Sequence, residues 1–284
     1  MGRTGMVQRC YITSGAAAMG NVQGGSLDID PNILRGISID GVEVNHGGLV
    51  KTVLEVDLHQ PLKTLMTAML RSAGTDTVSA QSFIVGTEGG YRTVAGAQPS
   101  GFTYSCSVDA IPECRVGYWA ITPSETVADQ SGTPQPAIGA TGINDEWSKI
   151  DVLVGTANGT GVDYECQRFE VTLNTNPIWH TSLDSRSTDS KRLPTAVYLG
   201  LQEWTVRLDC AERIPESVGL AIADSIATNL AVTIDGGGSG STSIDFDLNS
   251  LPSPKEPTEL VGPNDVPIWR YEWTKSTNGT TICV

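Results

Sequence analysis

Six cysteines and three histidines are the residues of this 284-residue chain best suited to metal binding or covalent chemistry. The cysteines form no CxxC motif, and no histidine lies at zinc-ligand spacing from a cysteine. His46, His59 and His180 are far apart in the sequence, and turns predicted beside His59 and His180 place these two in solvent. We therefore predict no metal site. The cysteines are Cys10, Cys106, Cys114, Cys166, Cys210 and Cys283.

Two pairs of cysteines could meet. Cys106 and Cys114 flank a turn at Asp109–Pro112 and could face each other across a hairpin. Cys166 and Cys210 lie at matching ends of two strands that we expect to pair. Free buried thiols are the expectation for a protein made inside a cell, and disulfides formed after release are the alternative.

Other patterns that could support catalysis or ion binding are weak. Gly237-Gly-Ser-Gly240 lacks the Lys-Ser/Thr of a phosphate-binding loop, so a hairpin turn is the better interpretation. Asp28/Asp30 and Asp245/Asp247 each share one strand face and could bind Ca²⁺, although solvent-facing or channel-facing positions explain them more simply. No G-x-S-x-G motif occurs. We predict no catalytic, cofactor-binding or metal-binding residues, no cofactor, and no enzymatic activity.

The chain is strongly acidic. It carries 32 acidic and 18 basic residues, a net charge of −14, and no basic cluster that would grip phosphates. Three explanations stay open: a surface that lets DNA pass by repulsion, simple solubility, or a host with a high-salt cytoplasm. No apolar run approaches the roughly 18 to 20 residues of a membrane span, and no secretory signal is recognised. We therefore expect synthesis in the host cytoplasm and no membrane partner.

An internal repeat organises the sequence. In the first half, an alternating strand at Val50–Leu58 precedes an amphipathic helix at Gln60–Arg71, with Pro61 in its first turn. Strands at Ser82–Val85 and Phe102–Val108 follow. In the second half, a strand at 202–210 precedes a helix at Pro215–Ala227 and strands at 230–235 and 243–248.

Upstream of these units, the segments Gly25–Asn32 and Arg168–Pro177 have a similar sequence pattern. Each predicts a strand that runs into an Asx/Pro turn. The second half carries a longer excursion, Trp179–Leu199, which is expected on a surface or at a partner contact. Near the C-terminus, Val266–Trp273 predicts a closing strand with Ile268, Arg270 and Glu272 on one face and aromatic residues on the other.

These boundaries predict three segments. Residues 1–121 form a first domain, 122–145 a Pro/Gly/Ser-rich linker or arm, and 146–284 a second domain. Many Gly (31) and Pro (15) residues with only two predicted helices indicate a mainly β fold. Trp204, Trp269 and Trp273 are expected to fill cores or subunit seams.

The chain resembles the tail tube proteins of long-tailed phages and tailed archaeal viruses, the major tail protein family. The resemblance spans most of the chain. It is carried by the strand pair Arg168–Leu173 and Gln202–Asp209, the helix Pro215–Ala227, the turn Asn174–Trp179, the re-entry Pro194–Leu201 and the unit Gly24–Ala73. Its long second-half excursion departs from the family pattern.

The resemblance implies two tandem β-sandwich or half-barrel domains, each with one flanking α-helix. It also implies a structural virion protein that assembles into stacked rings, a conduit for the viral genome. Rings of this family usually contain six domains, so two domains per chain imply a homotrimer with pseudo-sixfold symmetry. Closure of such a ring removes exposed strand edges. The implied partners are further copies of this chain and other tail proteins (tape measure, terminator and baseplate), with DNA passing through the lumen without specific binding.

Other functions remain open at this level. The chain could be another tail or baseplate component, a contractile-system tube, or a β-sandwich binding module of adhesin type. A binding module should be monomeric with an exposed aromatic platform, and a hydrolase is disfavoured because no nucleophile motif occurs. Acidic residues of Val50–Leu58 and Ser243–Leu248 are candidates for lining a channel. The sequence does not distinguish a bacterial from a halophilic archaeal host, a contractile from a non-contractile tail, or a trimeric from a hexameric ring, and it does not identify the stacking loops.

Overall fold

The protein is mainly β. The computed structural model describes residues 9–12, 20–30, 33–37, 43–61, 63–70, 78, 80–87, 90–123, 147–155, 161–181, 193–215, 230–235, 245–251, 258–260 and 267–277. These residues form 18 strands, one short α-helix and a single 3₁₀ turn at Trp147–Lys149. No helix within those ranges is long and apolar enough to cross a membrane.

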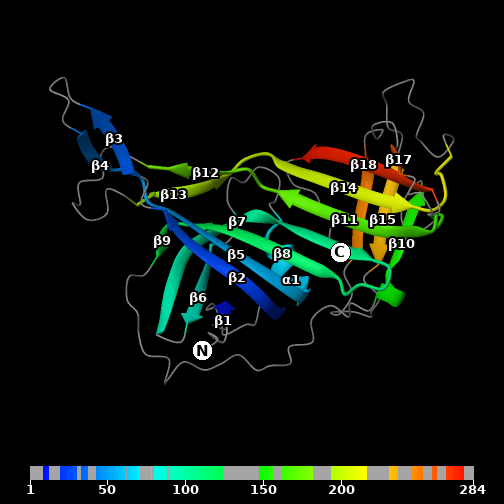
Figure 1. The fold of residues 1–284 in the computed structure, drawn as a ribbon, viewed down its shortest axis with the longest axis horizontal. Helices are drawn as coiled ribbons and strands as arrows, with labels where there is room; N and C mark the ends of the chain where they lie inside the picture. The colour runs from blue at the N-terminus through cyan, green and yellow to red at the C-terminus, as the bar shows by residue number, and fades with distance from the viewer. Residues whose placement is uncertain are drawn as a thin grey trace.

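One large antiparallel sheet crosses the whole molecule (Figure 1). Eight of its strands form a continuous path, and β1, β6 and β9 attach through the long strand β7. The path runs through β17 (Thr258–Leu260), β18 (Ile268–Thr277), β14 (Gln202–Cys210), β11 (Cys166–Asn174), β7 (Gly90–Ser107), β8 (Glu113–Ala120), β5 (Lys51–Pro61) and β2 (Gly20–Asp30). The attached strands are β1 (Arg9–Ile12), β6 (Gln81–Thr87) and β9 (Thr122–Pro123).

Three smaller sheets accompany the large one. A three-stranded sheet combines β10 (Asp151–Gly155), β15 (Leu230–Asp235) and β16 (Asp245–Leu251). Two hairpins, β3 (Ile33–Ile37) with β4 (Glu43–Gly47) and β12 (Pro177–His180) with β13 (Ala196–Leu199), complete the set. The β3–β4 hairpin projects away from the sheets at one end of the molecule (Figure 1).

The first predicted helix is shorter than its sequence pattern indicates. Helix α1 covers Lys63–Ala68, whereas β5 continues to Pro61, which pairs with Gly20. Pro61 therefore ends a strand and does not open the helix, so this prediction was wrong. The apolar stripe is confirmed in part, because Leu65, Met66 and Met69 are buried. The second predicted helix, Pro215–Ala227, lies outside the described residues from 216 onward.

Most predicted strands are found. The ranges 202–210 and 230–235 match β14 and β15 residue for residue, because strict alternation marks a half-buried strand. The closing strand is confirmed as β18, with Tyr271 and Trp273 on its buried side. Two other predictions fall on undescribed residues, the arm from residue 124 to 145 and the turn at Gly237–Gly240. The strands β15 and β16 on either side of that turn pair antiparallel.

The same order of strand pairing occurs twice along the chain. In residues 1–121, β1 pairs β6, β6 pairs β7, β7 pairs β8, β8 pairs β5, and β5 pairs β2. In residues 146–284, β10 pairs β15, β15 pairs β16, β17 pairs β18, β18 pairs β14, and β14 pairs β11. The pair β16 and β17 takes the place of the long β7. Each copy also has a hairpin, β3–β4 or β12–β13, inserted at the same point.

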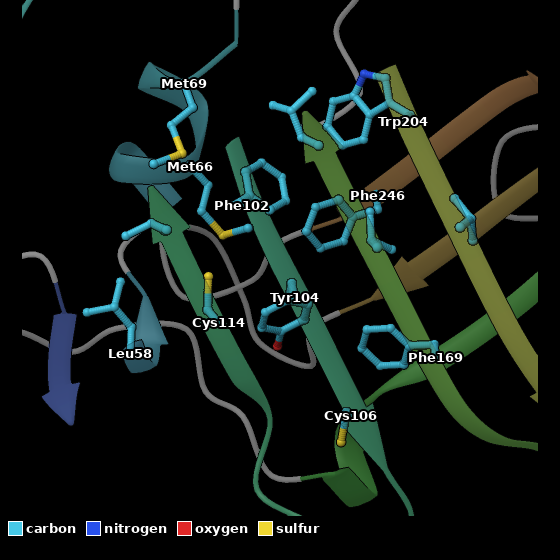
Figure 2. Close-up of a cluster of buried hydrophobic side chains, with 14 of the residues drawn as sticks. Leu58, Met66, Met69, Phe102, Tyr104, Cys106, Cys114, Phe169, Trp204 and Phe246 are labelled. Carbon is cyan, nitrogen blue, oxygen red and sulfur yellow. The ribbon is translucent and has the colours of Figure 1, made fainter. Parts of the chain in front are cut away.

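The core lies on one face of the large sheet. Phe102 and Tyr104 of β7 pack against Phe246 of β16, with ring centroids 6.1 and 5.6 Å apart. Trp204 of β14 meets Phe102 edge-on at 5.7 Å. Figure 2 shows Met66 of α1 and Met69, just after the helix, closing one end of this cluster. The two halves of the chain therefore share one core, and Trp204 and Trp273 fill it as predicted, each about 1% exposed.

The strands β7 and β11 join the two halves. Their antiparallel register runs from Gly101 opposite Asn174 to Ser107 opposite Arg168. Gly101 has φ 140°, and a Cβ there would lie 1.9 Å from the Leu173 carbonyl oxygen. Only glycine permits this approach of the backbones, so Gly101 is required for the seam.

Candidate functional site: the polar face and edges of the large sheet

The second face of the large sheet is polar. Side chains alternate along each strand, so apolar residues enter the core and their neighbours in sequence face outward. In β8, for example, Cys114, Val116 and Tyr118 are buried, whereas Glu113 and Arg115 are exposed. A row of four threonines (Thr103, Thr172, Thr205 and Thr274) crosses β7, β11, β14 and β18 on this polar face.

Acidic groups outnumber basic groups on the polar face. The register places nine carboxylates and five basic groups there, which gives a net charge of −4 per chain. The carboxylates belong to Asp28, Asp30, Glu55, Asp57, Glu113, Glu170, Glu203, Asp209 and Glu272. The basic groups belong to Lys51, Arg115, Arg168, Arg207 and Arg270.

Every arginine on the polar face contacts a carboxylate. Arg168 and Arg207 both reach Glu170, at 3.3 and 3.4 Å, and Arg207 also donates to Glu272 at 3.0 Å. The remaining two arginines form closer pairs, described next. Because these guanidinium groups are already engaged, the face offers few cations to the phosphates of a nucleic acid.

One aspartate–arginine pair recurs in both halves. Arg115 Nε donates to Asp57 Oδ1 at 2.7 Å across β8 and β5. Arg270 donates to Asp209 across β18 and β14, with Nε–Oδ1 2.7 Å and Nη2–Oδ2 2.8 Å. Hydrogen bonding to the aspartates is the main cause that raises the pKa of both arginines. The aspartates are 152 residues apart and the arginines 155, so the pairs occupy equivalent positions of the repeated pairing order.

Strands β2 and β17 form the two ends of the sheet path. Each pairs on one side only within the part of the chain that the structure describes. All three residues of β17 are exposed. An unpaired strand edge presents backbone donors and acceptors that can template the addition of another strand.

The β12–β13 hairpin contacts the first half of the chain. Trp179 of β12 stacks on Trp119 of β8, with ring centroids 4.7 Å apart and planes 11° from parallel. Asn176 Nδ2 donates to the Leu201 carbonyl at 2.8 Å, and Thr175 Oγ1 donates to the Pro99 carbonyl at 2.6 Å. The tryptophan stack and the Thr175 bond hold the hairpin against the first half, and the Asn176 bond closes its base within the second half.

Replacing Trp179 with alanine will remove an interaction of about 0.5–1.5 kcal/mol between the hairpin and β8. The exciton couplet of the stacked indoles should disappear from the circular dichroism spectrum of W179A and W119A alike. A double-mutant cycle of unfolding free energies should return the coupling. The control is W147A, because Trp147 is exposed and belongs to no such stack. Additive energies for W179A and W119A would contradict the contact.

The prediction that two pairs of cysteines face each other across neighbouring strands is confirmed for one pair only. Cys166 and Cys210 are direct cross-strand partners in β11 and β14. Cys114 lies opposite Tyr104, and Cys106 lies opposite Phe169, so the predicted facing of Cys106 and Cys114 across their hairpin was wrong. None of these four cysteines is in a disulfide. Burial raises the pKa of Cys114 far above its ordinary value.

The histidines and acidic pairs are dispersed. His59 Nδ1 lies 3.3 Å from the Pro112 carbonyl, and the exposed His180 contacts Thr195 Oγ1 at 3.1 Å. Asp28 and Asp30 share the exposed face of β2, as predicted. Asp245 and Asp247 belong to β16 of the three-stranded sheet, so they do not lie on the polar face. Among the described residues, no group of three or more His, Cys, Asp or Glu is placed to hold a metal ion.

Sequence reasoning missed the arginine–carboxylate network. The signal was present, because Arg207 and Glu272 each lie on the polar side of an alternating strand. Pairing them required the neighbour order β11-β14-β18, which sequence periodicity does not specify. The candidate channel residues of 50–58 are placed on the polar face as Glu55 and Asp57, whereas those of 243–248 are not.

The polar face should not retain double-stranded DNA. Glu55 and Glu203 lie on one cross-strand row and take part in no ion pair within the described ranges, so their reversal adds uncompensated positive charge. We expect the unmodified protein to leave DNA mobility unchanged and the E55K/E203K variant to bind at least about tenfold more tightly, with affinity that falls as salt rises. The matched control D151K/E212K changes the charge equally outside this face. DNA binding by the unmodified protein at moderate salt would contradict the prediction.

No protein-family model matches this chain, and no curated protein is similar enough to be recognised as a relative.

Proposed function

We propose that the chain is a structural virion protein whose rings stack into the tail tube that conducts the viral genome. The observation that carries the proposal is the repeated pairing order, with its in-chain seam between β7 and β11. Its end strands β2 and β17 each pair on one side only within the described residues. The ends are the counterparts of the two seam strands. A second chain can therefore extend the sheet by repeating a pairing that already exists within the first chain.

The repeat predicts the register of that contact between chains. Thr103 lies opposite Arg115, as Thr258 lies opposite Arg270, so β17 corresponds to the seam part of β7. Equivalent reasoning through the repeated aspartate–arginine pair aligns β2 with β11. Since β7 and β11 pair Thr103 with Thr172, the contact between chains pairs Thr258 with Asp28. The neighbouring pairs are Glu259 with Leu27 and Leu260 with Ser26.

Closure of the ring follows from the same edges. The two halves of the chain act as tandem domains related by pseudosymmetry, and the helix that the sequence predicts at Pro215–Ala227 is the proposed counterpart of α1. Three chains supply six such domains and close the sheet into a barrel without exposed edges. A closed ring avoids the uncontrolled strand addition that an open chain of copies would permit.

The polar face suits the inner wall of that barrel. Its opposite face is covered by α1, β6 and the three-stranded sheet, so the polar face is the side left for the lumen. A wall with a net charge of −4 per chain repels DNA and lets it slide. The β3–β4 and β12–β13 hairpins are then candidates for contacts between rings or with tail proteins such as the tape measure, terminator and baseplate.

Engineered cysteines test the register directly. A chain carrying T258C and D28C should form disulfides between chains under mild oxidation and give a covalently closed trimer on a non-reducing gel. The T258C/D30C control places the second thiol on the same strand face but out of register, and it should cross-link far less. Cross-linking that is equal in both variants, or absent in both, would contradict the proposed seam.

The alternatives give different outcomes. A tail terminator or baseplate component with this fold would form rings without extending into tubes under electron microscopy, whereas a contractile-system tube would also form tubes and would be distinguished by its copy number in a particle. A β-sandwich binding module would remain monomeric and fail to cross-link. Long tubes with a central channel are the result that the proposal predicts.

A further inference from the structure

The thiols of Cys166 and Cys210 face each other across β11 and β14. The two residues are register partners at the end of the ladder, just before an irregularity between Cys166 and Arg168. The Ala211 N–H donates to the Glu165 carbonyl at 3.0 Å. That bond joins the residue after Cys210 to the residue before Cys166, so the cysteines occupy a non-hydrogen-bonded pair position.

This position suits a disulfide. Cα atoms of a non-hydrogen-bonded pair are about 4.5 Å apart, within the range of about 4.4–6.8 Å that disulfides span. A hydrogen bond between the two thiols, followed by burial, raises the pKa of Cys210. Cys166 Sγ also donates to the Arg168 carbonyl at 3.1 Å, and neither cysteine is in a disulfide in this structure.

A small oxidant can reach this pair from one side. Cys166 is half-buried, whereas Cys210 is buried. A hollow of about 180 Å³ borders Cys166 and is lined also by Trp147 and Arg168. Thiol–disulfide exchange needs access to one sulfur of the pair, so a low-molecular-weight disulfide such as oxidised glutathione would react first at the more accessible Cys166.

We infer that Cys166 and Cys210 form a cross-strand disulfide when the folded protein meets an oxidised small-thiol pool. The Cys166 thiolate attacks a low-molecular-weight disulfide RSSR, which forms a mixed disulfide and releases one RS⁻. The Cys210 thiolate then attacks Cys166 Sγ and releases the second RS⁻. The two protein protons end on two RSH molecules, so one RSSR is reduced to two thiols as one protein disulfide forms.

The bond locks β11 to β14 and closes the chain segment that carries the β12–β13 hairpin. The cross-link restricts the unfolded chain, so it raises the thermal midpoint by about 5 °C or more. This inference concerns one chain and does not depend on ring assembly or on the proposed tail function.

Peptide mapping after incubation with oxidised glutathione tests the inference. We expect tryptic fragment 150–168 to be linked to fragment 208–213, the six thiols to fall to four, and dithiothreitol to reverse the link. Retention of all six thiols, a different pairing, or a Cys166 that stops at the mixed disulfide would each overturn it.

Single serine variants separate the pair from the other thiols. C166S is the main variant because Cys166 is half-buried, and it should lose both the link and the thermal shift while keeping a native spectrum. C106S is the control, since Cys106 lies opposite Phe169 and its thiol donates to the carbonyls of Ser107 and Ala110. C106S should link normally. If oxidation raised the thermal midpoint of C166S as much as that of the unmodified protein, the Cys166–Cys210 disulfide would be contradicted.

Discussion

Replacing Glu259 with proline will produce a folded protein that does not assemble. The proposed ring makes β17 an interior strand, between β18 of its own chain and β2 of the next. Proline lacks the backbone N–H and is excluded from interior strands. Because β17 has only three residues and all are exposed, the substitution costs the isolated chain little stability. Light scattering should report the mass of one chain where the unmodified protein forms multi-chain particles.

The matched control is E259A. Alanine removes the same carboxylate but keeps the N–H, so this variant should assemble like the unmodified protein. Circular dichroism should show native spectra for both variants. Rings formed by E259P at normal yield would show that β17 is not a contact between chains.

Replacing Phe246 with alanine will destabilise both halves of the chain together. Phe246 is fully buried and packs on Phe102 and Tyr104, which belong to the other half. Truncating a buried phenylalanine typically costs about 3–5 kcal/mol of unfolding free energy. Urea unfolding followed by tryptophan fluorescence and by far-ultraviolet circular dichroism should give midpoints that fall by the same amount with both probes.

A small change at the surface serves as the comparison. Val162 is 54% exposed, so V162A should change the unfolding free energy by no more than about 0.5 kcal/mol. Separate transitions in F246A, with only one displaced, would mean that the halves do not share a cooperative core.

Local patterns predicted the strands well. The strand β14 alternates strictly, with Trp204, Val206 and Leu208 on the buried side, and this periodicity fixed its bounds. The prediction made helix α1 too long because the helical spacing of apolar residues continues upstream of Lys63. Pairing of Pro61 with Gly20 in the sheet overrides that local preference.

Long-range pairing could not be derived from local patterns. Neighbour order in a sheet depends on which strands share a core, and the contact of Gly101 with Asn174 joins segments that have no local signal in common. The repeat was visible as an order of elements, and its counterpart in space is the repeated pairing order. The matched pairs Asp57–Arg115 and Asp209–Arg270 became recognisable only when the register was known.

The cysteines illustrate the same limit. Cys166 and Cys210 are paired by two long strands whose match was predictable from their alternation. Cys106 and Cys114 surround a short turn, and a shift in its register placed Cys114 opposite Tyr104. A change of this size at a turn is enough to separate two thiols.

The number of chains per ring tests the central proposal most directly. We would purify the protein, image it by negative-stain electron microscopy, and measure the mass of its particles by light scattering in low and molar salt. Rings or tubes with a central channel and a mass of three chains per ring are the predicted result. Six chains per ring would contradict the pseudo-sixfold trimer in which each chain supplies two domains, and a monomer in every condition would contradict the tube itself.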